Sequence, residues 1–403
     1  MSYLLEGSFT FLNFKIPRRF LSSLFIVLIV KLAISAIIYW SFKLAFSDSF
    51  WMDAGSVEPL IQNQALLDGV AVGPRWAYIF LGWDSAWYLS IVKDGYIFSS
   101  QSFAFYPVFP VLARFFLLIS SPVAALAFCS LVFGVLWVPL YQAFAEEYLS
   151  RKSAFISVLL FAVSPFTLIF TSVGYSEGVF LFITVGAWLL FIRGRRMEAF
   201  FVAAIATLVR PPGILVILPM FSVIVSKKNH WSRLKAVSRL IMPLAALLLW
   251  LLYSWKISGD PLASFHSTEW SSMYTLTTYF AQVLPKFGLA ALSFPALEIN
   301  LHWLTPLFIW SSLIIAPFLI WRLREVSRAL TLYCLTYMLG ILFFGTILSL
   351  PRFIAVLFPI WIPITSQLIS IRHSRIIIPI VFITSVAISY ILWVGFLSGI
   401  FIA

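Results

Sequence analysis

Residues 21–46 read LSSLFIVLIVKLAISAIIYWSFKLAF, and this apolar run decides the fold. A helix that crosses a bilayer needs about 20 mostly apolar residues, because lipid offers the backbone no hydrogen-bond partners. The run is too long for a signal peptide, so we expect it to remain in the protein as a first helix. Lys15, Arg18 and Arg19 precede the run and place the N-terminus in the cytoplasm by the positive-inside rule.

The whole chain has the composition of a membrane protein. Of its 403 residues, 62% are hydrophobic and 10% are charged, and the mean hydropathy is +1.01. A transmembrane barrel would show short alternating strands instead of such long apolar runs. The formal charge of +12 lies in short Lys and Arg clusters between the runs, as in cytoplasmic loops, so we expect no nucleic-acid partner. The sequence therefore predicts an all-α, polytopic bundle of transmembrane helices.

We expect about eleven spans in a single domain, residues 1–403. After the first helix, the spans are predicted at residues 122–144, 153–172, 177–193, 197–210, 212–226, 238–256, 303–321, 329–349, 353–371 and 376–397. In this assignment the basic clusters between spans face the cytoplasm, as the positive-inside rule requires. A shift by one span would place most of them outside.

Two long loops are then external. They are residues 47–121, which are rich in Asp and Glu, and residues 257–302. Residues 106–119 are apolar but short and contain two prolines and an arginine, which favours a re-entrant or interfacial helix. If that segment crossed the membrane, nearly every later basic cluster would face outside. We therefore expect the chemistry on the extracytoplasmic face.

The first loop contains a short amphipathic helix. Trp83, Trp87 and Ile91 recur at helical spacing, so the helix is expected to lie along the membrane surface. Asp84 has two alternative roles. It either caps or solvates this helix within an interfacial aromatic belt, or it is a general base within reach of a lipid-linked substrate.

Several short motifs lie in order along the chain. They are Trp83-Asp84, Phe105-Tyr106-Pro107-Val108-Phe109-Pro110, Ser164-Pro165 followed by Tyr175-Ser176-Glu177, Arg210-Pro211-Pro212-Gly213, Gly259-Asp260-Pro261-Leu262 and Pro351-Arg352-Phe353. In order and spacing the first four resemble the GPI mannosyltransferase II (PIG-V-like) family, over most of the chain, and the last two lie downstream on the same predicted face. That family in turn resembles the GT-C class of multispanning glycosyltransferases, which use a polyprenyl-phosphate sugar donor and an acidic residue in the first external loop.

The resemblance implies an inverting glycosyltransferase. It would transfer mannose from a polyprenyl- or dolichyl-phosphate mannose donor to a lipid-linked or surface glycan acceptor. A carboxylate deprotonates the acceptor hydroxyl as this attacks the anomeric carbon, and a lipid phosphate leaves. Asp84 matches the base. Asp94 is the reserve candidate, and its alternative role is to close the helix beside Gly95.

A departing phosphate needs cationic donors near the outer leaflet. The predicted topology places Arg352, Arg210 and Arg114 at external helix ends or in the short apolar segment. Arg352 is the first candidate, because Pro351 fixes the turn beside it. The alternative for each arginine is snorkelling to lipid headgroups.

A further set of residues is predicted to bind the sugar or the acceptor: Trp83, Tyr88, Tyr175, Glu177, His266, Glu269 and Trp270. Glu177 either satisfies free amide groups at a helix start or grips sugar hydroxyls or an arginine. His266 and Glu269 either line an acceptor site or lie in a solvated loop.

The sequence defines no metal site, because neither its histidines nor its acidic residues have convincing ligand spacing, and metal dependence stays open. Lys31 lies inside the first apolar run, where it either snorkels inward or meets a phosphate. Two other classes of protein compete with the transferase: a sugar or lipid transporter with a midplane site on broken helices, and a noncatalytic subunit that binds a lipid-linked sugar. A small membrane partner subunit also stays open.

Overall fold

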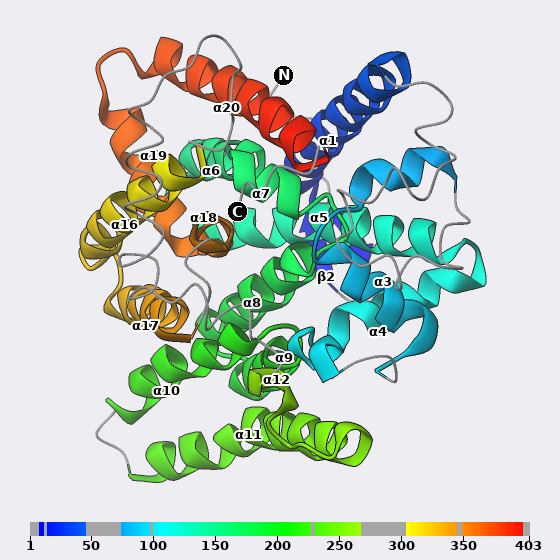
Figure 1. Ribbon diagram of the computed structural model, residues 1–403. Coiled ribbons are helices and arrows are strands. Elements are labelled where there is room, and N and C mark those ends of the chain that lie inside the picture. Colours follow the sequence, from blue (N-terminus) through cyan, green and yellow to red (C-terminus); the bar gives the residue numbers. More distant parts are fainter. Residues whose placement is uncertain are drawn as a thin grey trace.

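The computed structural model describes residues 8–11, 14–45, 74–96, 100–226, 230–266, 304–344 and 349–397. Most of these residues are helical (Figure 1). An antiparallel hairpin of two short strands, β1 (Ser8–Phe11) and β2 (Phe14–Pro17), precedes the first helix. The expected helical bundle is therefore confirmed in its class.

The helices and 3₁₀ turns (η) follow in this chain order: α1 (Arg18–Ala45), η3 (Arg75–Phe80), α3 (Ser85–Asp94), η4 (Ser100–Ala104), α4 (Val108–Phe115), η5 (Phe116–Leu118), α5 (Pro122–Ala145), α6 (Arg151–Val163), α7 (Pro165–Phe170), α8 (Glu177–Ile192), α9 (Arg196–Thr207), η6 (Pro211–Val216), α10 (Ile217–Val225), α11 (His230–Ser258), α12 (Ala263–His266), α16 (Leu304–Leu323), α17 (Arg328–Phe344), α18 (Leu350–Ala355), η10 (Phe358–Ile360), α19 (Trp361–Ser370) and α20 (Ser374–Leu397).

Four of the described helices are long and apolar enough to cross a membrane: Phe20–Leu44, Pro122–Ala145, Val237–Ser258 and Ser374–Leu397. Two expected continuous spans are broken instead. The span predicted at 153–172 divides at Ser164, because Pro165 has no amide hydrogen and holds the preceding residue in extended geometry. The span predicted at 353–371 divides into α18, η10 and α19. The arrangement of eleven spans stays a prediction.

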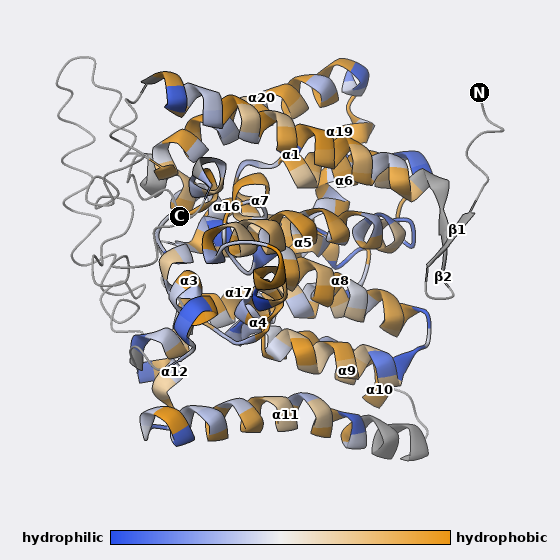
Figure 2. Ribbon diagram, turned by 90° about the vertical axis from the view of Figure 1, so that its right-hand side faces the viewer, coloured by the Kyte–Doolittle hydropathy of each residue, from blue (hydrophilic) through white to orange (hydrophobic). Residues whose placement is uncertain are grey.

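The bundle is a succession of packed helices. Helix α1 packs on α5, α5 on α8, α8 on α9, and α9 on α11. In Figure 2 these helices run side by side, and α3 and α12 lie at the end of the stack opposite the β hairpin. Large apolar side chains stay exposed along α1 and α11, among them Phe25, Ile29, Leu248 and Leu249. Such outward apolar surface suits contact with lipid.

Helices α5 and α8 approach most closely at two glycines. A Cβ atom on Gly178 would lie 2.9 Å from the backbone nitrogen of Gly134. A Cβ atom on Gly134 would collide with the carbonyl oxygen of Thr171, which follows α7. Small residues let helix backbones approach in this way. The absence of a side chain at Gly134 therefore lets the segment that connects α7 to α8 pack directly against α5.

We expect Gly134→Ala to destabilise the fold, because the new methyl group meets rigid backbone and not a flexible side chain. Overpacking of this kind costs roughly 1–3 kcal/mol. Gly186→Ala in α8 is the matched control, since its Cβ atom would make an ordinary 3.7 Å contact with Leu140. Thermal unfolding in detergent checks this, and equal melting temperatures for the two variants would contradict the packing.

Candidate functional site

The turn before α3 has an unusual backbone. Trp83 has a φ angle of +49°, which a bulky residue rarely adopts and which marks local strain. Ser85 Oγ donates a 2.8 Å hydrogen bond to the carbonyl oxygen of Gly82 and so closes the turn. A side chain at Gly82 would collide with the ring of Phe396 in α20. Packing therefore holds the turn in a shape that local preferences disfavour.

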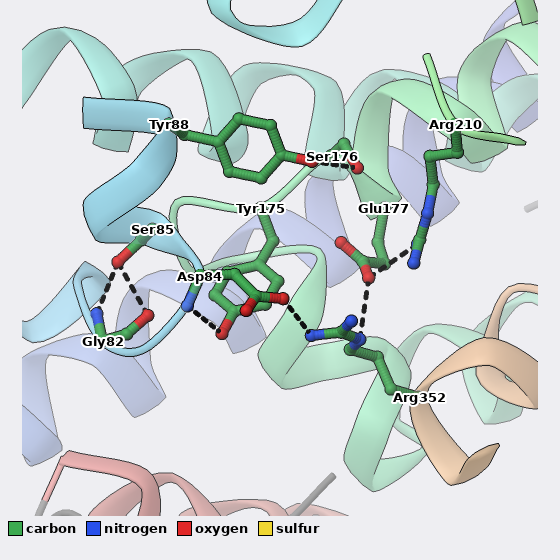
Figure 3. Close-up of polar contacts among 9 residues, drawn as sticks. All are labelled: Gly82, Asp84, Ser85, Tyr88, Tyr175, Ser176, Glu177, Arg210 and Arg352. Carbon is green, nitrogen blue, oxygen red and sulfur yellow. Dashed lines mark hydrogen bonds and ion pairs between the residues drawn. The ribbon is translucent and has the colours of Figure 1, made fainter. Parts of the chain in front are cut away.

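This turn directs Asp84 toward a residue far along the chain (Figure 3). Asp84 lies at the N-cap position of α3, but its side chain makes no capping bond there. Its Oδ2 accepts a 2.7 Å hydrogen bond from Nη1 of Arg352, in α18. Its backbone amide donates to the hydroxyl of Tyr175 over 3.1 Å. Of the alternatives for Asp84, the structure disfavours capping.

Glu177 joins two arginines. It is the first residue of α8, and its Oε1 accepts a 2.6 Å hydrogen bond from Nη1 of Arg210. The same oxygen lies 3.4 Å from Nε of Arg352. Its other oxygen, Oε2, is buried and has no hydrogen-bond partner among the described residues. The structure thus brings together Asp84, Glu177, Arg210 and Arg352, which we call the ionic cluster.

The ionic cluster is buried and balanced, with two carboxylates and two guanidinium groups. The side chain of Asp84 is 23% exposed, whereas Glu177 is 1% exposed and both arginines are 9% exposed. Burial lowers the pKa of Arg352, but attraction by Asp84 and Glu177 outweighs it, and the net pKa shift is upward. Arg352 therefore stays charged, and Asp84 is the member most open to a substrate.

Aromatic rings flank both arginines. The ring centroid of Phe353 lies 4.9 Å from the guanidinium carbon of Arg210 and 5.0 Å from that of Arg352. Phe170 faces Arg352 at 5.5 Å. These cation–π contacts stabilise the two buried guanidinium groups. Phe353 was not among the predicted site residues, although it adjoins Arg352 in the Pro351-Arg352-Phe353 motif.

The segment from Phe105 to Pro110 supports α3. The ring of Phe105 stacks on Trp87 with centroids 6.0 Å apart, and Phe109 meets Tyr88 edge-on at 4.7 Å. The hydroxyl of Tyr88 donates to Ser176 Oγ over 3.0 Å. This predicted sugar-binding tyrosine is therefore tied to the residue before Glu177. Ser176 was not among the predicted site residues.

Other predicted site residues lie apart from the cluster or outside the described residues. Arg114 donates 2.9 Å hydrogen bonds to the carbonyl oxygens of Ile91 and Val92. It thus provides hydrogen-bond partners for carbonyl groups at the C-terminal end of α3. Asp94 is exposed at that same end. Trp83 is partly buried beside Asp84 and packs on the main hydrophobic core.

The second predicted external loop is described only in part. His266 Nδ1 lies 2.6 Å from Oδ2 of Asp260 in an exposed pair. Glu269 and Trp270 lie outside the described residues. The short helix α12 packs against η4, so parts of the two predicted loops meet. Within the described ranges, no three His, Cys, Asp or Glu residues gather as metal ligands would.

The apolar helices, four of them long enough to cross a bilayer among the described residues, make this chain an integral membrane protein. Residues 21–275 match the model of the family described as Mannosyltransferase (PIG-V), and the chain belongs to that family.

Curated relatives carry matching names. The chain is 31% identical over 183 residues to GPI alpha-1,6-mannosyltransferase 2 of Rattus norvegicus, covering 42% of this chain and 34% of that protein. It is 26% identical over 186 residues to GPI mannosyltransferase 2 of Schizosaccharomyces pombe, covering 45% and 40%. The chain thus spans well under half the length of these relatives. Among solved structures, an oligosaccharyltransferase of Archaeoglobus fulgidus aligns with 92% of this chain and 53% of its own at 13% identity, with a TM-score of 0.43, which is too low to assign a shared fold.

We expect Glu177→Gln to destabilise the protein strongly, because it leaves two buried guanidinium groups without a shared carboxylate. Breaking a buried ion pair from one side costs about 3–5 kcal/mol. Glu198→Gln is the matched control, since Glu198 pairs with Arg195 on the exposed surface. Chemical or thermal unfolding in detergent compares the two, and a Glu177→Gln variant as stable as Glu198→Gln would rule out this role.

Proposed function

We propose that this protein is a mannosyltransferase that uses a polyprenyl- or dolichyl-phosphate mannose donor. The observation that carries the proposal is the 2.7 Å pair of Asp84 and Arg352 in a member of the PIG-V family. It places a carboxylate that can take a proton beside a guanidinium that can bind phosphate, which are the two groups that the transfer needs.

In the proposed reaction, Asp84 is the general base. The acceptor hydroxyl gives its proton to the Asp84 carboxylate as its oxygen bonds to the anomeric carbon of mannose. The bond from that carbon to the phosphate oxygen breaks, and the polyprenyl phosphate leaves with the electron pair. Attack from the opposite face inverts the configuration. Asp84 suits this role because it is the most exposed member of the ionic cluster.

Arg352 and Arg210 are the proposed phosphate ligands. Both guanidinium groups are already held by Glu177, so they need little reorganisation when negative charge develops. Arg352 has a second carboxylate partner, Asp84. The donor phosphate therefore competes with Asp84 for Arg352, and phosphate binding releases Asp84 to act as a base.

The acceptor is proposed to be a lipid-linked or surface glycan. The curated relatives are named as GPI mannosyltransferases, and GPI is a glycolipid, which supports this class of acceptor. We place the reaction on the extracytoplasmic face of a GT-C-like bundle, in the first predicted external loop. The known family disfavours the transporter alternative.

The test is transfer of radiolabelled mannose from polyprenyl-phosphate mannose to membrane lipids and glycans by the purified protein. We expect Asp84→Asn to lower the transfer rate by roughly 10²–10⁴-fold, because the amide cannot accept the proton. Asp94→Asn is the matched comparison on the same helix, and its rate should stay near that of the wild type. Both variants are checked for folding by size-exclusion chromatography.

The outcomes separate the competing functions. Equal rates for wild type and Asp84→Asn would refute Asp84 as base, and loss of transfer in Asp94→Asn alone would move that role to Asp94. A wild type that binds the donor without transferring mannose to any acceptor extract would point to the noncatalytic subunit. Movement of the donor across vesicles without transfer would point to a transporter.

A further inference from the structure

Lys31 is buried in the middle of α1, with none of its surface exposed. Its ammonium donates to Thr171 Oγ1 over 2.6 Å, to Ser172 Oγ over 2.9 Å and to the carbonyl oxygen of Thr171 over 3.1 Å. The carbonyl oxygen of Leu168 lies at 3.5 Å. All four acceptors belong to residues 168–172, at the C-terminal end of α7.

No described carboxylate forms an ion pair with this lysine. The negative end of α7 and two hydroxyl groups compensate its charge instead. An ammonium group has three N–H donors, and the three shorter contacts use them all. Lys31 therefore has no donor left for a phosphate, and its contacts point into the protein and not to a lipid headgroup. Of the two roles considered for it from the sequence, the inward orientation agrees with these contacts, whereas contact with a phosphate is disfavoured.

The tethered segment leads directly to the ionic cluster. Residues 171–176 connect α7 to α8 and carry Tyr175, which accepts from the backbone of Asp84, and then Glu177. Gly134 of α5 lies against the carbonyl oxygen of Thr171, with no room for a side chain between them. The amide of Gly174 donates to the carbonyl oxygen of Phe80 over 2.7 Å. The segment is thus held from α1, from α5 and from η3.

We propose that Lys31 is a positioning residue for the ionic cluster. It ties the start of the 171–176 segment to α1 and so sets where Tyr175 and Glu177 stand relative to Asp84 and Arg352. It touches none of the reacting groups. The role in catalysis rests on the proposed transferase function, whereas the role in holding the segment does not.

The test compares Lys31→Met, which keeps the length of the side chain without its donors, with Lys43→Met as the matched control. Lys43 lies on the same helix, is exposed and contacts Trp40. Hydrogen exchange of the amides in residues 171–177 is measured first. We expect it to rise roughly tenfold or more in Lys31→Met, with α5 and the rest of α8, residues 178–192, unchanged, because the opening is local. Lys43→Met should match the wild type.

Transfer kinetics form the second arm. Misplaced catalytic groups lower kcat by roughly 10–100-fold, and we expect this in Lys31→Met with the donor KM changed less than about threefold. Lys31→Gln, which retains an N–H donor, should recover part of the loss. A merely structural role would instead lower the folded fraction and leave kcat per folded molecule unchanged.

Each outcome decides the proposal. Wild-type exchange in residues 171–177, or exchange that rises equally throughout the protein, would overturn it. Local exchange with normal kcat would overturn the catalytic part. Local exchange in a protein whose wild type transfers no mannose would reject the transferase function and retain the tether. If Lys31→Met does not fold, Thr171→Val, which removes one acceptor, should show the same local change to a smaller extent, and its absence would contradict the tether.

Discussion

One buried carboxylate, that of Glu177, supports the rest of the site. It binds Arg210, at the start of η6, and Arg352, in α18, and it is 1% exposed. Buried guanidinium charges need carboxylate partners, because an unpaired buried charge is strongly unfavourable; Arg352 also pairs with Asp84, whereas Glu177 is the carboxylate that Arg210 contacts. The packing of α8 against its neighbours is therefore linked to the geometry of the ionic cluster. Phe353, which faces both arginines, completes their surroundings.

The need to pair the buried arginines also distinguishes Asp84 from Glu177. Glu177 is committed to two arginines, whereas Asp84 contacts one and remains partly exposed. An anionic donor that binds this site competes with the carboxylates for the two guanidinium groups. We infer that Arg352, shared by both carboxylates, is the residue where this exchange takes place. Lys31 helps to position the ionic cluster through its hydrogen bonds to Thr171 and Ser172, at the start of the segment that leads to Tyr175 and Glu177.

Sequence reasoning succeeded where the signal is local and failed where it depends on contacts across the chain. The first helix followed from its long apolar run. Asp84 and Arg352 were each predicted as site residues, and their functional roles stay predictions. Their direct contact joins residues 268 positions apart and has no local signal. Pro165 was visible in the sequence, yet hydropathy alone favoured a continuous span across it. The contacts of Lys31 and those of Arg114 with the end of α3 depend on packing, which no single sequence displays.

The most direct test of the central claim is an experimental structure with a polyprenyl phosphate bound. We predict phosphate oxygens within hydrogen-bonding distance of the Arg352 guanidinium, with the Asp84 carboxylate separated from it and Glu177 still in contact with both arginines. A phosphate bound elsewhere, with the 2.7 Å contact between Asp84 and Arg352 intact, would contradict it.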